Sequence, residues 1–351
     1  MINNSSASHS LADIGWRPLL QQQLTLEELD LFSPARVIEL HRSEIELVGT
    51  AGSVTIALIK SMPEVAVGDW VLLNQAQQLH RVLERFCQFA RKAPGSKVAE
   101  QIIAANVDTA LIVCSLNDDF NLNRIERFLS MVNEAGAEPC VVLSKADLCC
   151  EVELKQALVQ DLDRAMPVIA INGLKSAARQ QLLPWCNAGQ TLVLLGSSGA
   201  GKSTLTNTLL GEQKQLTAAV RLSDSKGKHT TTSRSMLQMS TGAMLLDTPG
   251  MRELQLVACE EGIAATFSEV EALVRLCKFS DCGHLSEPGC AVQAALNSGE
   301  LNERRFVNYQ KLLREQAKNS ATLAQRRKYD KNLGQFYKRV IDASAKNKRG
   351  E

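Results

Sequence analysis

The stretch from residue 196 to residue 204 has the residue types and spacing of a phosphate-binding loop. Gly196, Gly201, Lys202 and Ser203 fit the pattern G-x-x-x-x-G-K-[ST], in which backbone N–H groups curve around a phosphate at a helix N-terminus. The lysine ammonium would neutralise charge on the β- and γ-phosphates, and the serine hydroxyl would bind Mg²⁺. The predicted nucleotide contacts here are Gly196, Ser197, Ser198, Gly199, Ala200, Gly201, Lys202, Ser203 and Thr204.

A second phosphate-side element is the turn Asp247-Thr-Pro-Gly250, which follows the apolar residues 244–246. The turn is therefore expected at the carboxyl end of a strand, where ligands bind in open α/β sheets. We expect Asp247 to act as the second carboxylate on the magnesium side and the Gly250 N–H to contact the γ-phosphate.

Between these two elements lies the polar segment 226–233, which reads KGKHTTTS. It stands where a γ-phosphate-sensing switch belongs in this topology. Thr230 or Thr231 could complete the magnesium coordination there. An ordinary surface loop would have the same composition, so the sequence leaves both interpretations open.

The choice of base is indicated by the tetrapeptide Ser144, Lys145, Ala146 and Asp147, which follows the apolar residues 140–143. A carboxylate at Asp147 can accept two hydrogen bonds from guanine N–H groups, a pattern that adenine does not offer, and the Lys145 stem would cover the base. This favours GTP. An ATP-using small-molecule kinase is the enzyme alternative, and it predicts a preference for ATP.

Four soft or borderline metal ligands lie within one short segment, and they are Cys277, Cys282, His284 and Cys290. Three thiolates and one imidazole suit a tetrahedral structural zinc ion and leave no open position for catalysis. The other cysteines are scattered along predicted strands, where buried free thiols are the simpler interpretation.

An α/β domain must position the nucleotide residues. Helical spacing is expected over 123–134 and 151–164. Buried parallel strands are expected at the continuous apolar runs 108–114, 140–143, 167–171, 191–195 and 244–247.

The region before this domain has a different pattern of short apolar runs broken by turns. A small barrel of the OB kind is expected, which could bind RNA or be purely structural. Residues 87–101 are basic and are expected to form a connector between domains. The five predicted strands of the barrel are 35–40, 45–48, 54–59, 70–73 and 79–83.

The order of the motifs is unusual, because the base-reading tetrapeptide precedes the phosphate loop. In ordinary guanine-nucleotide switches it follows. Together with the barrel and the cysteines, this permuted order resembles the circularly permuted GTPases of the RsgA (YjeQ) family, which are small-subunit ribosome biogenesis factors. Further matching segments are Gly15-Trp-Arg17, Val67-Gly-Asp-Trp70, Ala104-Ala-Asn-Val-Asp108, Phe120-Asn-Leu-Asn-Arg-Ile-Glu126 and His229-Thr-Thr-Thr232.

The resemblance implies GTP hydrolysis in late assembly of the small ribosomal subunit, with that subunit and its rRNA as partners. It also implies the same four zinc ligands. Met251 stands where many GTPases carry a water-orienting Gln. Hydrolysis must then use another group, and the resemblance implies His229, whose ordinary pKa near neutrality suits proton handling. A solvated loop histidine is the alternative.

Three positions depart from the family pattern. Ser144 replaces Asn or Thr at the start of the base motif, so the link from this side chain to the phosphate loop is expected to weaken. The Ser-Ala-type base-supporting motif is replaced by Ile-Asn-Gly at 171–173, so no residue is assigned there. Lys228 stands where Arg commonly precedes the histidine.

Length and charge complete the picture. A chain of 351 residues points to two or three domains. No long apolar run and no signal-like start is present, so a cytoplasmic protein without a membrane span is expected. The net charge of +1 conceals a basic segment, 301–351, with 14 Lys and Arg against 5 Asp and Glu. It favours a polyanionic partner, and a solvated helical tail is the alternative.

We therefore expect a multidomain, monomeric GTPase that binds GTP and GDP with Mg²⁺ and one structural Zn²⁺. A different class remains open, namely a nucleotide-gated RNA-binding module with negligible hydrolysis. The predicted parts are an N-terminal extension over 1–32, an OB-like β-barrel over 33–90, a circularly permuted α/β GTPase domain over 98–256 and a small α-helical zinc-binding domain with a basic tail over 257–351.

Overall fold

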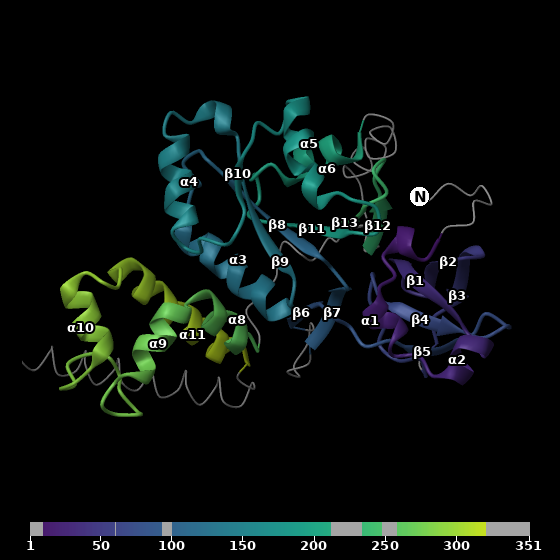
Figure 1. The fold of residues 1–351 in the computed structure, drawn as a ribbon, viewed down its shortest axis with the longest axis horizontal. Coiled ribbons are helices and arrows are strands. Elements are labelled where there is room, and N and C mark those ends of the chain that lie inside the picture. Colours follow the sequence, from purple (N-terminus) through teal and green to yellow (C-terminus); the bar gives the residue numbers. More distant parts are fainter. Residues whose placement is uncertain (1–9, 60, 93–99, 212–233, 248–257, 321–351) are drawn as a thin grey trace, which may run out of the picture.

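The computed structural model describes residues 10–59, 61–92, 100–211, 234–247 and 258–320. In Figure 1 the N-terminal strands lie at one end, an α/β sheet lies in the middle, and the C-terminal helices lie at the other end. The predicted residues His229, Thr230, Thr231 and Gly250 lie outside the described residues. No helix in the described part of the chain is long and apolar enough to cross a membrane.

Five parallel strands form the centre of the fold, in the order β10-β9-β8-β11-β13. Each of the five predicted strands is present. Every residue of β8 and β11 is buried, as expected for a parallel sheet with both faces covered. The bounds are β8 Thr109–Ser115, β9 Glu138–Ser144, β10 Val168–Ala170, β11 Thr191–Leu195 and β13 Met244–Asp247.

Helices cover the two faces of this sheet. One face packs on α3 (Leu122–Ala135) and α4 (Val152–Gln160), whose apolar side chains share a core with alternate residues of β8. The other face packs on α5 (Ser176–Leu182) and α6 (Lys202–Leu210). The alternation follows from the period of two along a strand.

The N-terminal region forms antiparallel strands in the order β3-β2-β1-β4-β5. Their side chains enclose a small apolar core of their own. No pairing joins β3 to β5 among the described residues. The region begins with η1 Ala12–Ile14, α1 Pro18–Gln21 and α2 Leu26–Leu31, and its strands are β1 Ser33–Leu40, β2 Glu44–Gly49, β3 Gly52–Ala57, β4 Trp70–Leu73 and β5 Leu79–Val82.

The two regions share one sheet. Strand β12 (Arg234–Gln238) pairs with β13 on one side and with the end of β1 on the other, through the pairs Glu39↔Ser235 and Leu40↔Arg234. The result is a single 11-stranded sheet. Trp70 is fully buried against Trp16 and belongs to the core, so its ring is not exposed to stack on RNA bases.

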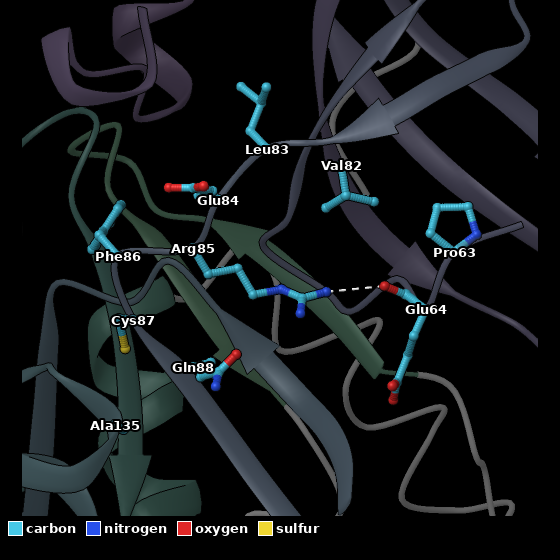
Figure 2. Close-up of a pocket in the computed structure, with 10 residues that line it drawn as sticks. All are labelled: Pro63, Glu64, Val82, Leu83, Glu84, Arg85, Phe86, Cys87, Gln88 and Ala135. Atoms are coloured by element: carbon cyan, nitrogen blue, oxygen red, sulfur yellow. Dashed lines mark hydrogen bonds between the residues drawn. The ribbon is translucent and has the colours of Figure 1, made fainter. Parts of the chain in front are cut away.

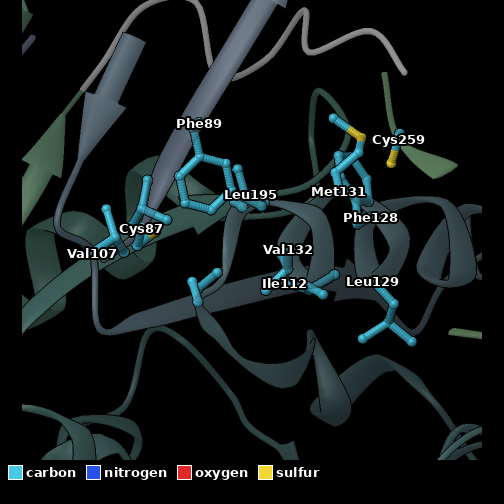
Figure 3. Close-up of a cluster of buried hydrophobic side chains, with 14 of the residues drawn as sticks. Cys87, Phe89, Val107, Ile112, Phe128, Leu129, Met131, Val132, Leu195 and Cys259 are labelled. Carbon is cyan, nitrogen blue, oxygen red and sulfur yellow. The ribbon is translucent and has the colours of Figure 1, made fainter. Parts of the chain in front are cut away.

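The prediction that residues 87–101 form a connector is wrong for the described part of this segment. Strands β6 (Gln88–Lys92) and β7 (Glu100–Ala105) form an antiparallel hairpin. Cys87 and Phe89 are buried while Gln88 is exposed, an alternation that the basic composition concealed. Figure 3 shows Phe89 in the same buried cluster as residues of α3 and β11.

The C-terminal helices pack against α3. A Cβ built on Gly262 of α8 would lie 2.0 Å from the Ser130 carbonyl oxygen of α3, so only glycine allows this close approach. Within the described residues 258–320 the helices are α8 Glu260–Thr266, α9 Ser268–Arg275, α10 Ala291–Ser298 and α11 Glu303–Ser320.

A buried carboxylate fixes α11 on α3. Glu126 is fully buried and accepts hydrogen bonds from Arg304 at 2.9 Å, from Arg305 at 3.0 Å and from Asn308. Arg304 and Arg305 belong to the basic segment 301–351, for which the sequence favours a polyanionic partner. In the structure these two cations serve an internal carboxylate, because an unpaired buried charge would be costly.

A buried guanidinium joins the N-terminal region to the α/β sheet. Arg36 of β1 donates to the carbonyl oxygens of Ile14 at 2.5 Å, Asn106 at 3.1 Å and Gly68 at 3.5 Å, and to the Thr191 hydroxyl at 2.7 Å. Burial lowers the pKa of Arg36 to about 10, which still leaves the group charged at neutral pH.

Replacement of this guanidinium by an apolar side chain should destabilise the protein. We expect Arg36→Met to lower the free energy of unfolding by about 3–5 kcal/mol, because several buried acceptors lose their donor. Urea unfolding would measure the change. The matched control is Arg42→Met at an exposed position, which should stay within about 0.5 kcal/mol of the wild type. Equal stability of the two variants would contradict this account.

Candidate functional site

The carboxyl ends of the parallel strands bring the predicted nucleotide residues to one edge of the sheet. Ser144 ends β9, Leu195 precedes the phosphate loop at the end of β11, and Asp247 ends β13. Strand β8 lies between β9 and β11. The base motif and the phosphate loop therefore lie close together although about fifty residues of chain separate them.

The phosphate loop has the backbone that its glycines allow. Gly196, Gly199 and Gly201 have φ values of +139°, +78° and +97°, a region in which other residues are strained. A Cβ on Gly196 would lie 2.2 Å from the Val113 carbonyl oxygen. The Lys202 ammonium, at the start of α6, donates to the Gly196 carbonyl at 2.6 Å, so its side chain points back over the phosphate loop.

The base motif is attached directly to this loop. Ser144 Oγ donates to the Ala200 carbonyl oxygen at 2.5 Å, so this side chain links the motif to the phosphate loop. That the link is weaker than one from Asn or Thr stays a prediction. Lys145 has a left-handed backbone with φ of +58°. Asp147 is exposed, as a group that reads a ligand's base must be.

The segment Ile171-Asn-Gly173 completes the surroundings of the motif. The Ala146 N–H donates to the Ile171 carbonyl at 3.1 Å, and the Thr208 hydroxyl of α6 donates to the Gly173 carbonyl at 2.7 Å. The segment thus lies between the base motif and α6.

One polar residue beside the loop was not predicted. Asp119, in the connection between β8 and α3, accepts a hydrogen bond from Ser197 Oγ at 2.7 Å. Asp119 lies just before the segment 120–126, which matches the family, but a single aspartate in a loop has no characteristic spacing to other residues. Only the three-dimensional contact identifies it.

The four predicted zinc ligands converge. Their ligand atoms all lie within 4.8 Å of one another. The Cys277 and Cys290 sulfurs are 3.9 Å apart, and His284 Nδ1 is 3.6 Å and 3.5 Å from them. A tetrahedral zinc ion would hold two sulfurs about 3.8 Å apart and a sulfur and a nitrogen about 3.6 Å apart. The ligand atoms of Cys277, His284 and Cys290 match these separations, and the Cys282 sulfur lies within 4.8 Å of each of them, so the four residues could hold a zinc ion.

Neighbouring groups hold two of these ligands in place. The Gln293 side chain donates to the His284 carbonyl at 2.6 Å, and the Gln293 N–H donates to the Cys290 sulfur at 3.4 Å. The Phe306 ring of α11 meets the His284 ring edge to face at 6.1 Å. Such outer contacts orient metal ligands.

The scattered cysteines differ from the cluster in their surroundings. Burial raises the pKa of Cys87, Cys140 and Cys259 to about 12 and that of Cys186 to about 11. These thiols stay protonated at neutral pH and are unreactive. The interpretation as buried free thiols holds for them, whereas Cys150 is exposed.

Comparison with known proteins agrees with this geometry. A family model described as RsgA GTPase matches residues 82–257. The Vibrio parahaemolyticus (serotype O3:K6) protein named Small ribosomal subunit biogenesis GTPase RsgA 2 is 55% identical over 341 residues, which cover 97% of this chain and 95% of that protein. The chain belongs to the RsgA GTPase family. It is a GTP-hydrolysing enzyme.

Other comparisons extend to a more distant relative and to solved structures. A Xanthomonas axonopodis pv. citri protein named Small ribosomal subunit biogenesis GTPase RsgA is 46% identical over 305 residues, 84% of this chain and 83% of that protein. YjeQ from Thermotoga maritima has a TM-score of 0.60 at 24% identity, covering 81% of this chain and 98% of its own. YloQ, described as a circularly permuted GTPase, has a TM-score of 0.57 at 23% identity, covering 81% and 94%. These structures share the fold.

A surface depression lies away from the nucleotide residues of this RsgA-family GTPase, where β5 leads into β6 (Figure 2). Arg85 crosses it and donates to the Glu64 carbonyl at 3.0 Å and to both carboxylate oxygens of buried Asp69. The guanidinium is thus satisfied within the protein. The depression is part of the packing between the N-terminal strands and the hairpin, and the phosphate loop remains the candidate site.

Loss of one cysteine from the cluster should remove the metal. We expect the wild type to retain one Zn²⁺ per chain after dialysis, and Cys282→Ser to retain far less, because three ligands do not close a tetrahedral site. Elemental analysis measures the content. The matched control is Cys150→Ser, which removes an exposed thiol outside the cluster and should keep one zinc. Full zinc content in Cys282→Ser would contradict the assignment.

Proposed function

We propose that this GTPase acts in late assembly of the small ribosomal subunit and binds the subunit and its rRNA in a nucleotide-dependent way. Its relatives carry the name Small ribosomal subunit biogenesis GTPase, and the identity extends over nearly the whole chain. For guanine as the base, the observation that carries the proposal is the hydrogen bond from Ser144 to Ala200, because it joins the base motif to the phosphate loop.

The proposed nucleotide site takes GTP and GDP with Mg²⁺. Lys202 would leave its loop carbonyl for the β- and γ-phosphates, while Ser203 at the start of α6 and Asp247 at the end of β13 would serve the magnesium side. Asp147 would accept the guanine N–H groups. The remaining contacts are those predicted from the sequence: the rest of the loop from Gly196 to Thr204, Thr230, Thr231 and Gly250.

The remaining assignments are also proposals. We assign an OB-like barrel to residues 33–90 after the extension 1–32, the permuted GTPase domain to 98–256, and the zinc-binding helical domain with its basic tail to 257–351. The zinc ion would be structural. The protein would work as a cytoplasmic monomer, and its positive tail would meet rRNA phosphates.

The assignment to the small subunit is tested by sedimentation. The protein should move with purified small subunits in a non-hydrolysable GTP analogue and remain mostly free in GDP. Large subunits at the same concentration serve as the control. Equal sedimentation in both nucleotides, or equal binding to large subunits, would contradict the proposal.

His229 is the proposed catalytic group for hydrolysis, since Met251 offers no polar atom that can orient the attacking water. We expect His229→Ala to lower phosphate release in the presence of small subunits by about 100-fold, the usual contribution of a positioned acid or base. Binding of the GTP analogue should change little. Hydrolysis at the wild-type rate would exclude this role, and absence of stimulation in the wild type would favour a nucleotide-gated binding module.

A further inference from the structure

Asp119 connects the phosphate loop to the first turn of α3. One carboxylate oxygen accepts the hydrogen bond from Ser197 Oγ at 2.7 Å. The other accepts from the Arg124 guanidinium at 2.5 Å. Asp119 is half-buried, and its carboxylate is shared between a residue of the loop and a residue of the helix.

The backbone around Asp119 is fixed by short-range contacts. Asn117 Oδ1 accepts from the Asp119 N–H at 3.2 Å and from the Ser115 hydroxyl at the end of β8 at 2.7 Å. Asn121 caps α3 by accepting from the Arg124 N–H at 3.1 Å. The carboxylate is therefore placed by the end of a central strand and the start of a helix, both of them ordered elements.

Helix α3 is itself held from behind. Glu126 is buried under Arg304, Arg305 and Asn308 of α11. Farther along, Glu134 accepts from the Gly262 N–H of α8 at 2.7 Å. With the sheet on one side and two C-terminal helices on the other, α3 is a firm support against which a loop can be positioned.

The charge of Asp119 needs an explanation, because an anion beside a phosphate site repels the ligand. The hydrogen bond from Arg124, with that from Ser197, lowers the pKa of Asp119, so the carboxylate is ionised at neutral pH. The positive charge of Arg124 also offsets the negative charge of Asp119, so a bound phosphate would be repelled less. An ionised acceptor forms a stronger hydrogen bond than a neutral one, and the pair supplies it without a net negative charge.

We propose that Asp119 is a positioning residue for nucleotide binding, which holds the Ser197 end of the phosphate loop in its phosphate-accepting conformation while Arg124 neutralises it. The proposal rests on the proposed assignment of residues 196–204 as the phosphate loop. It makes two separable statements. Asp119 and Ser197 act as one unit, and Arg124 acts through the charge of Asp119.

The first statement is tested with fluorescent GDP. Asp119→Ala and Ser197→Ala should each weaken binding about tenfold, and the double variant should be no weaker than either single variant, because both remove the same hydrogen bond. The KM for GTP should rise by the same factor, with kcat within about twofold of the wild type. Asp119→Asn, which keeps an acceptor oxygen, should recover most of the affinity. Asp118→Ala, at an exposed neighbouring position, is the matched control and should bind as the wild type does.

The second statement is tested by ionic strength. Arg124→Gln should weaken GDP binding, because the Asp119 carboxylate would then repel the phosphates of GDP. Salt screens this repulsion, so the loss of affinity should become smaller as the salt concentration is raised. In an Asp119→Asn background the same change should have no further effect. A merely structural role for Arg124 would give a loss that salt and the Asn background leave unchanged.

GDP binding by the variants distinguishes a wrong role for Asp119 from a wrong assignment of the phosphate loop. Suppose that Lys202→Ala abolishes GDP binding while Asp119→Ala and Ser197→Ala bind GDP as the wild type does. The proposed role of Asp119 is then wrong and the assignment of the phosphate loop stands. The same conclusion follows if the losses of affinity in Asp119→Ala and Ser197→Ala add in full in the double variant. If the wild type binds no GDP, both are wrong. Should Asp119→Ala fail to fold, Arg124→Gln compared in the wild-type and Asp119→Asn backgrounds carries the test, since neither change removes a predicted nucleotide contact.

Discussion

The need to satisfy one buried guanidinium constrains how the N-terminal strands and the parallel strands of this protein meet. Arg36 of β1 is essentially inaccessible to solvent. Its hydrogen bonds reach Ile14 in the N-terminal turn, Asn106 directly after β7, and Thr191 at the start of β11. A charge without partners at this depth would cost several kcal/mol. The segments that supply the acceptors must therefore assemble together.

The consequence extends to the phosphate loop. Thr191 is held from a second side, because its N–H donates to the Asp108 carboxylate at 2.6 Å, and Asp108 is itself paired with Arg17. Strand β11 is only five residues long, from Thr191 to Leu195, and the loop follows at once. Because β11 is short, the contacts that hold Thr191 at its start also determine where the phosphate loop begins at its end. The N-terminal region thus contributes to the placement of the phosphate loop.

The permuted order of the motifs does not alter the site, since a parallel sheet places residues by strand adjacency. Ser144 and Gly201 are far apart in the chain, yet a Cβ on Gly201 would lie 3.5 Å from Ser144 Oγ. This is why sequence motifs could predict which residues lie at this edge of the sheet: each motif consists of local residues at a strand end. The central strands were equally predictable, because continuous apolar runs identify them.

Other features depended on contacts between distant residues and could not be predicted in this way. The hairpin of β6 and β7 lies in a basic segment, and its burial alternates over only a few residues. Arg304 and Arg305 are indistinguishable in sequence from cations that face solvent, until Glu126 is seen to be buried beneath them. Asp119 is a single loop carboxylate with no spacing signature. In each case the partner lies on another element.

The same contacts bear on the role of the metal. Helices α9 and α10 have eight residues each, shorter than an isolated helix needs for stability. Cys277 follows the end of α9, and Cys290 caps the start of α10. An ion held by both would cross-link the two helices and restrict the unfolded chain between them. Because His284 also packs against Phe306 of α11, the metal would bring this pair of helices to α11, which Glu126 attaches to α3. The cysteine and histidine cluster, with an ion bound, and the buried carboxylate would therefore be two parts of one attachment of the C-terminal helices to the GTPase domain.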